Sequence, residues 1–164
     1  MKTLWIVRHA KAEAIDWAKK DYDRKLKNSG KEDAAKVAEK IKKSKLPLDA
    51  IVCSSAKRTY ETAVVFAKIF GVEEARIIPH DDLYNAEHFS YQSVVSELDN
   101  KYKNVAIIGH NPGITDFANK QAVATIDDMP TSAAIGVSYN TEDWQSAASS
   151  EKKFLGFYSP VFDF

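Results

Sequence analysis

The 164-residue chain has little cysteine and no excess charge of either sign, and both shortages narrow its possible functions. Its one cysteine, Cys53, cannot form an internal disulfide, and no Cys/His cluster predicts a zinc site. The 23 basic and 23 acidic side chains cancel, so no bulk charge favours nucleic acid or an anionic membrane surface. Any site for an anion must therefore be local, and we expect neither a metal nor a cofactor.

Long hydrophobic runs and glycine-rich loops are missing as well. The longest apolar runs have five or six residues, far short of the roughly 20 that span a bilayer. The 6 glycines form neither a P-loop nor a dinucleotide-binding fingerprint. The N-terminus begins a strand at once, without the pattern of a signal peptide. We therefore expect one domain over residues 1–164, in a reducing cytoplasm.

Strand-like and helix-like segments alternate along the chain. Short apolar runs predict strands, and apolar side chains at three-and-four spacing predict helices. The expected strands are 3–8, 49–53, 76–78, 104–109, 133–139 and 153–158, and the expected helices are 29–43, 56–70, 91–102 and one opened by Pro112. The alternation predicts a three-layer α/β/α sandwich, with a mainly parallel sheet and an antiparallel edge formed by the last two strands.

Three strand-to-helix corners carry residues suited to an anion. Arg8 and His9 end the first strand, Arg58 follows the second, and His110 follows the strand 104–109. The carboxyl ends of parallel strands share one edge of a sheet, so we expect these four side chains around one pocket. Arginine and helix N-termini both favour phosphate. Two arginines and two histidines predict phosphoryl transfer, with one imidazole attacking phosphorus and the other stabilising the transition state.

The motifs at these three corners, and a fourth in the 9–27 connection, resemble those of the histidine phosphatase (phosphoglycerate mutase-like) superfamily. The superfamily's Arg-His signature resembles Arg8-His9-Ala10-Lys11, and its second histidine motif resembles Gly109-His110-Asn111-Pro112. Its second arginine motif resembles Ser54-Ser55-Ala56-Lys57-Arg58-Thr59 with Glu61-Thr62-Ala63. A segment of the small SixA-like phosphohistidine phosphatase branch resembles Asp23-Arg24-Lys25-Leu26 with Gly30.

The resemblance implies a role for each of the four residues. His9 is the expected nucleophile, which becomes phosphorylated and is then released by water. Arg8, Arg58 and His110 are expected to hold the phosphoryl group. The guanidinium groups supply the positive charge, so the implied enzyme is a metal-independent phosphatase. Its partner would be a phosphorylated histidine-bearing protein or a small phosphorylated substrate.

One departure from the family pattern bears on the substrate. Many larger relatives place a glutamate two residues after a leucine, as general acid, whereas Leu83-Tyr84-Asn85 puts an amide there. An alkoxide leaving group needs a proton in the transition state. Imidazole, with an ordinary pKa of about 6.5, leaves more easily. Asn85 therefore favours a phosphohistidine substrate, and the SixA-like branch resembles this chain in lacking the acid.

Two alternatives stay open. The first is a small-molecule phosphomonoester phosphatase of the same superfamily, with Glu87 or Asp82 as the acid. The second is a catalytically silent phosphoprotein-binding module. The intact set of two histidines and two arginines argues against the silent module.

Other polar and aromatic residues receive structural predictions. Cys53 is expected to be a buried strand-end residue, because four residues rather than five separate it from Arg58. Asp23 and Arg24 are expected to fix the 9–27 connection rather than to perform chemistry, and Trp17 to pack against the first helix. Whether His80 or His88 touches the substrate is left open by the sequence.

Overall fold

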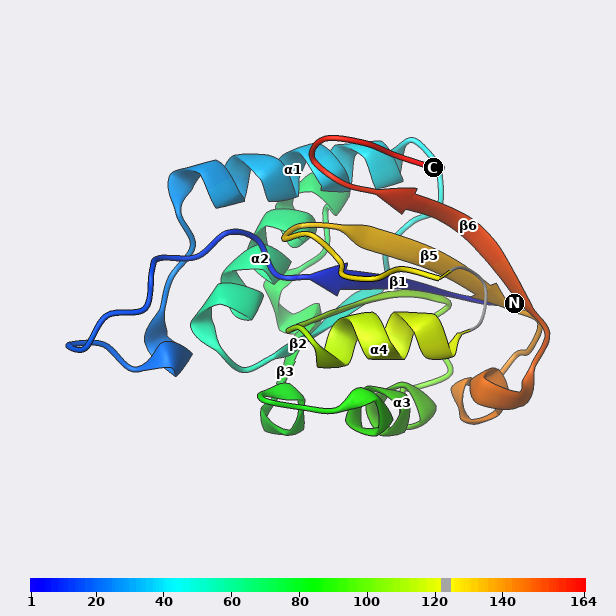
Figure 1. Cartoon of the computed structure of the whole chain (residues 1–164). Helices are drawn as coiled ribbons and strands as arrows, with labels where there is room; N and C mark the ends of the chain where they lie inside the picture. The colour runs from blue at the N-terminus through cyan, green and yellow to red at the C-terminus, as the bar shows by residue number, and fades with distance from the viewer. Residues whose placement is uncertain (122–124) are drawn as a thin grey trace.

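The computed structural model describes residues 1–121 and 125–164. Within these residues, six strands form one sheet in the order β3-β2-β4-β1-β5-β6 (Figure 1). The strands β3, β2, β4 and β1 are parallel to one another, β5 is antiparallel to β1, and β6 is antiparallel to β5. The strands are β1 (Lys2–Arg8), β2 (Ala50–Ser54), β3 (Ile77–His80), β4 (Asn104–Gly109), β5 (Ala134–Tyr139) and β6 (Lys152–Tyr158). The predicted sheet, with its antiparallel edge, is confirmed.

Helices cover both faces of the sheet, which confirms the three layers (Figure 1). Successive side chains of a strand point to opposite faces, so β1 contributes to two cores. Trp5 and Val7 belong to the core under α1 (Asn28–Lys42) and α2 (Lys57–Phe70). Leu4 and Ile6 belong to the core under α3 (His88–Ser96) and α4 (Gly113–Lys120). None of the helices in the described residues has both the length and the apolar character needed to cross a bilayer.

The helix predicted over 91–102 is wrong at both ends, because α3 spans only His88–Ser96. Backbone N–H groups of the expected last turn do not donate to the carbonyls four residues earlier, as a helix requires. The Lys101 N–H donates to the Asp99 carboxylate at 2.9 Å, and the Tyr102 N–H donates to the Asp99 carbonyl at 3.1 Å. These local bonds compete with the helix and replace its last turn. A 3₁₀ helix over Trp144–Ser149, before β6, was not predicted.

The 9–27 connection, called the arm below, folds back on itself beside the carboxyl ends of the strands. An antiparallel bridge pairs Ala12 with Leu26, and the Lys27 N–H donates to the Lys11 carbonyl at 2.9 Å. A Cβ on Gly30 would lie 2.2 Å from that carbonyl oxygen, so only glycine lets α1 approach the arm so closely.

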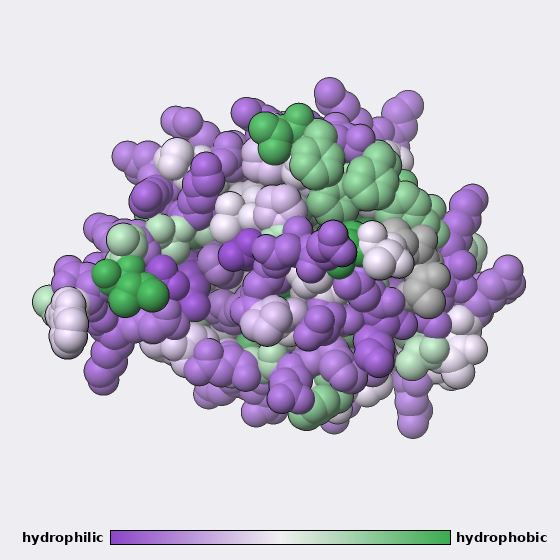
Figure 2. All heavy atoms as spheres, in the orientation of Figure 1, coloured by the Kyte–Doolittle hydropathy of each residue, from purple (hydrophilic) through white to green (hydrophobic). Residues whose placement is uncertain are grey.

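The far end of the arm projects from the molecule. Trp17 is fully exposed there, so the prediction that it packs against the first helix is wrong. Ile15 is 82% exposed, and apolar atoms are visible on this projection at the left of Figure 2. The arm therefore presents apolar side chains to solvent at its tip and polar ones near the sheet.

Candidate active site

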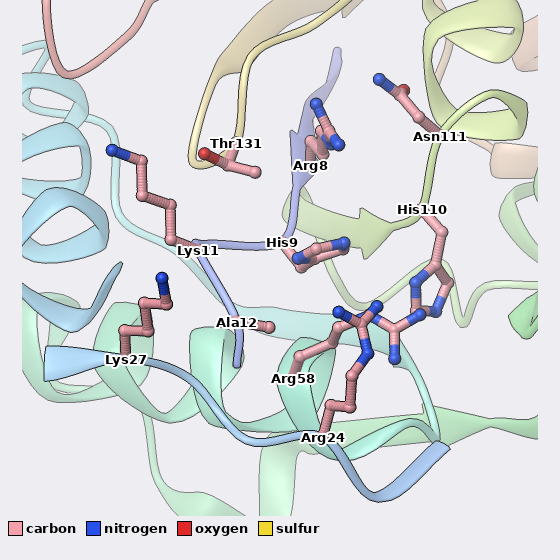
Figure 3. Close-up of a pocket in the computed structure, with 10 residues that line it drawn as sticks. All are labelled: Arg8, His9, Lys11, Ala12, Arg24, Lys27, Arg58, His110, Asn111 and Thr131. Atoms are coloured by element: carbon pink, nitrogen blue, oxygen red, sulfur yellow. The ribbon is translucent and has the colours of Figure 1, made fainter. Parts of the chain in front are cut away.

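A cavity of about 350 Å³ opens at the carboxyl edge of the parallel strands (Figure 3). All four residues predicted to meet there line it, contributed by the ends of β1 and β4 and by the first turn of α2. The arm supplies much of the remaining wall. The lining residues are Arg8, His9, Lys11, Ala12, Arg24, Lys27, Arg58, His110, Asn111 and Thr131.

The His9 ring lies between Arg8 and Arg58 (Figure 3), and one hydrogen bond determines its tautomer. Its Nδ1 is 2.7 Å from the Ala10 carbonyl oxygen. A carbonyl oxygen only accepts, so Nδ1 carries the proton and Nε2 of the neutral ring keeps a lone pair. Burial lowers the pKa of His9 to about 4; the Ala10 carbonyl opposes this, and Arg58 and Arg8 add to it. His9 is therefore neutral at pH 7, as a nucleophile must be.

His110 faces His9, with the ring centroids 5.4 Å apart. Its Nε2 lies 2.8 Å from the Ser54 hydroxyl oxygen, and its backbone N–H donates to the Tyr91 hydroxyl at 3.0 Å. Burial, the charge of Arg58 and the neighbouring His9 lower the pKa of His110 to about 3. Ser54 and Tyr91 thus hold a second neutral imidazole beside the first.

In each of the two predicted arginines, part of the guanidinium group is hydrogen-bonded to the protein and part is left without a partner among the described residues. Arg8 donates through Nη1 to the Met129 carbonyl at 2.7 Å. Arg58 donates through Nη1 to the Asp21 carbonyl at 2.8 Å and through Nη2 to the Asp21 carboxylate at 3.1 Å. The Nε atoms of Arg8 and Arg58 are buried and have no partner among the described residues. Buried donors without partners are costly, and an anion in the cavity would offset that cost.

A third arginine, Arg24, also lines the cavity, which the sequence did not predict. Arg24 donates to the Asp21 carboxylate at 3.0 Å and to the Glu13 carbonyl at 2.8 Å, which fixes the arm as expected, yet its side chain also lines the cavity. Asp21 therefore joins two arginines. Although burial opposes it, a hydrogen bond from Tyr84 and the charge of Arg58 lower the pKa of Asp21 to about 2. The motif at residues 23–26 pointed to Arg24, whereas no sequence signal distinguished Asp21.

The residues considered as acids lie elsewhere. None of Asp82, Asn85 and Glu87 lines the cavity. Asn85 is exposed with a φ of 54°, and Glu87 is the exposed N-cap of α3. Asp82 lines a separate cavity, together with His80. His88, the first residue of α3, packs edge-on against Phe89 and does not line the His9 cavity either.

Cys53 is a buried residue of β2, as predicted. Burial raises the pKa of its thiol to about 12, so the reactive thiolate form is suppressed at neutral pH.

The sandwich fold and this cluster of imidazoles and guanidiniums define an α/β protein with a candidate anion site at the carboxyl edge of its sheet. The family follows from the sequence itself. A family model of the histidine phosphatase superfamily (branch 1) matches residues 4–107, and the chain belongs to this superfamily. The matched segment includes Arg8, His9 and Arg58 and ends just before His110.

Solved structures share the fold over nearly the whole chain. A candidate phosphohistidine phosphatase SixA from Nakamurella multipartitia superposes with a TM-score of 0.82 at 21% identity, covering 98% of this chain and 97% of that one. The protein histidine phosphatase SixA in complex with tungstate gives 0.80 at 21% identity, covering 96% and 97%. A mycobacterial glucosyl-3-phosphoglycerate phosphatase gives 0.66 at 14% identity, covering 93% and 96%.

A curated relative is closer in sequence but adds no activity. An uncharacterized chloroplastic protein of Arabidopsis thaliana is 29% identical over 156 residues, which is 89% of this chain and 70% of that protein.

The buried imidazoles predict an unusual titration in the free protein. In ¹H–¹⁵N spectra recorded from pH 3 to 8, we expect His9 to titrate near pH 4 and His110 lower still, rather than near the ordinary pKa of about 6.5. Because the rings interact, the two midpoints belong to the pair. The lowered pKa leaves both rings neutral above about pH 5. Inorganic phosphate should raise both midpoints, and His9→Asn assigns the signals. A His9 midpoint near 6.5 would contradict this account of the site.

Proposed function

We propose that this protein is a metal-independent phosphohistidine phosphatase that dephosphorylates a protein histidine through phosphorylated His9. The observation that supports this proposal most directly is the set of side chains that line the cavity. It combines two neutral imidazoles with three guanidinium groups and, among the described residues, contains no carboxyl group that could protonate a leaving alkoxide. Asp21 lies just behind the wall, but with a pKa of about 2 it is ionised and cannot donate a proton.

In the proposed first step, Nε2 of His9 attacks phosphorus. A bond from Nε2 to phosphorus forms as the bond from phosphorus to the substrate imidazole breaks. The substrate ring departs as neutral imidazole once its other nitrogen has taken a proton from solvent. The guanidinium groups of Arg8 and Arg58 and the neutral ring of His110 donate hydrogen bonds that stabilise the negative charge on the phosphoryl oxygens. Arg24 adds a third positive charge to the wall of the cavity.

In the second step, water attacks the phosphorus of phosphorylated His9. A new phosphorus–oxygen bond forms, the bond to Nε2 breaks, and the proton of the water passes to solvent. This releases inorganic phosphate and regenerates the neutral His9 ring. The hydrogen bond from Nδ1 to the Ala10 carbonyl keeps Nε2 directed at phosphorus throughout.

The arm supports a protein as the substrate. Ile15 and Trp17 are exposed at its tip, and its base supplies Arg24 to the cavity. Exposed apolar side chains beside a polar cavity are typical of surfaces that contact proteins.

The test compares leaving groups. General acids contribute about 10²- to 10⁴-fold, so an enzyme without one should favour phosphohistidine over a sugar phosphate by at least about 10²-fold in kcat/KM. Its rates with aryl phosphates should rise steeply as the leaving group becomes more acidic. A sugar phosphate turned over as fast as a phosphohistidine peptide would instead support the phosphomonoesterase, and binding without turnover of any substrate would support the silent module. Added chelator should leave the activity intact.

A further inference from the structure

The cavity extends past the position of a phosphoryl group. Its volume of about 350 Å³ falls in the range of about 300–1,000 Å³ typical of sites for whole small ligands. The predicted phosphoryl ligands Arg8, Arg58 and His110 surround His9. Lys11 and Lys27 line the cavity on another side of that ring, next to the arm backbone (Figure 3).

The two lysines are direct neighbours across the arm. The bridge between Ala12 and Leu26 puts Lys11 opposite Lys27, and the Lys27 N–H donates to the Lys11 carbonyl at 2.9 Å. Residues directly opposite in an antiparallel pair share a face, and both lysine side chains lie on the same side of the His9 ring in Figure 3. Like charges in this arrangement are destabilising.

No acid of the arm relieves this repulsion. The Glu13 carboxylate pairs with Lys19 at 2.9 Å, and that of Asp21 pairs with Arg24 and Arg58. Neither Lys11 nor Lys27 forms a salt bridge with any residue that the structure describes. The arm therefore concentrates two unneutralised charges on the wall of a cavity that already contains three arginines.

We infer that Lys11 and Lys27 form a second anion subsite, which binds another negatively charged group of the substrate beside the phosphoryl group. This inference rests on the proposed function and narrows its substrate class. On a protein, the second group is the carboxylate of an aspartate or glutamate that neighbours the phosphohistidine. A second phosphate on a small molecule offers the same chemistry, and the two sources are separated by the test.

The first arm of the test uses two end-blocked phosphohistidine peptides that differ only in glutamate or glutamine beside the histidine. Lys11 and Lys27 are both exposed, so the unaltered protein should favour the glutamate peptide by only about five-fold in kcat/KM, and by less at high salt. In the K11Q/K27Q double variant this ratio should fall to about one. The control is Lys68→Gln, which removes the charge of an exposed lysine in the last turn of α2, at the other end of that helix from Arg58. The preference of this variant for the glutamate peptide should be unchanged.

The second arm does not depend on turnover. Calorimetry compares the binding of inorganic phosphate with that of pyrophosphate, whose second phosphate probes the lysines. Pyrophosphate should bind more tightly to the unaltered protein and to Lys68→Gln, and the K11Q/K27Q variant should lose this advantage. An unchanged pyrophosphate advantage in K11Q/K27Q overturns the subsite.

The outcomes separate the two proposals. If no phosphohistidine peptide is turned over but the pyrophosphate advantage depends on the lysines, the proposed function fails and the subsite stands. If peptides are turned over with equal rates and the pyrophosphate advantage is insensitive to the lysines, the function stands and the subsite fails. A pyrophosphate effect without any glutamate preference assigns the second anion to a small phosphorylated molecule.

Discussion

The His9→Asn variant is expected to lose turnover by about 10⁴-fold or more, because removing a covalent nucleophile leaves only binding and charge stabilisation. Asparagine keeps a polar side chain of moderate size at a position that is only 9% exposed, but it has no nitrogen lone pair that can attack phosphorus. The fold should therefore persist while the covalent step is lost.

The measurement traps the intermediate. A peptide with labelled phosphohistidine is mixed rapidly with enzyme and quenched in alkali, and protein-bound label is counted. The unaltered protein should show labelled His9, and His9→Asn should show none. The matched control, His88→Asn, makes the same change outside the cavity and should label normally. Label that persists in His9→Asn would place the nucleophile elsewhere.

The central part of the cavity could be predicted from the sequence for a geometric reason. Arg8, His9 and His110 come at or directly after the ends of β1 and β4, which pair in parallel, and Arg58 is in the first turn after β2. Once the apolar runs are assigned as parallel strands, chain connectivity alone brings these residues to one edge. Neither long-range loop packing nor side-chain detail was needed.

The arm could not be predicted in this way. Arg24 and Lys27 reach the cavity because the arm reverses and pairs Ala12 with Leu26. That reversal depends on the close contact of Gly30 with the Lys11 backbone, and on a hydrogen bond from the Leu26 N–H to Glu61 at 2.9 Å. Such contacts join residues far apart in the sequence and leave no periodic pattern. The error in the helix predicted over 91–102 has a local origin instead, since the N–H groups of Lys101 and Tyr102 bond to Asp99 rather than to the carbonyls four residues earlier.

Carboxylates close to Asn85 in the sequence do not replace the missing acid, because the fold keeps them away from the cavity. Asp82 and Glu87 are close to Asn85 in the sequence, yet the turn at Leu83 and the start of α3 leave all three outside the cavity. Tyr84 instead lies with its ring centroid 5.6 Å from that of His110 and donates to the Asp21 carboxylate at 2.7 Å. The segment that carries the acid in larger relatives thus contributes a side chain that holds Asp21 in place.

We expect Arg58→Ala to reduce kcat/KM by about 10²- to 10³-fold, the loss typical of removing one preorganised donor from a developing anion. Arg58 is 5% exposed, and Asp21 holds its guanidinium through two hydrogen bonds, so little reorganisation is needed when phosphate binds. Arg58→Lys keeps the charge but loses the fork of donors and should recover only part of the activity. The control is Arg76→Ala, which removes an exposed arginine from a 3₁₀ helix away from the cavity and should leave kcat/KM unchanged.

A double-mutant cycle separates a catalytic role of Arg58 from a merely structural one. Asp21 touches the reaction only through the arginines, so Asp21→Asn alone should lower kcat/KM by less than Arg58→Ala does. In the Arg58→Ala background, Asp21→Asn should cost much less than it does alone, because its main partner has already gone. Thermal unfolding of all four proteins provides the second readout, since a structural role would lower Tm in step with activity. Losses that simply add would show that the Asp21 side chain and Arg58 act independently, and that the bond to the Asp21 carboxylate does not position the guanidinium.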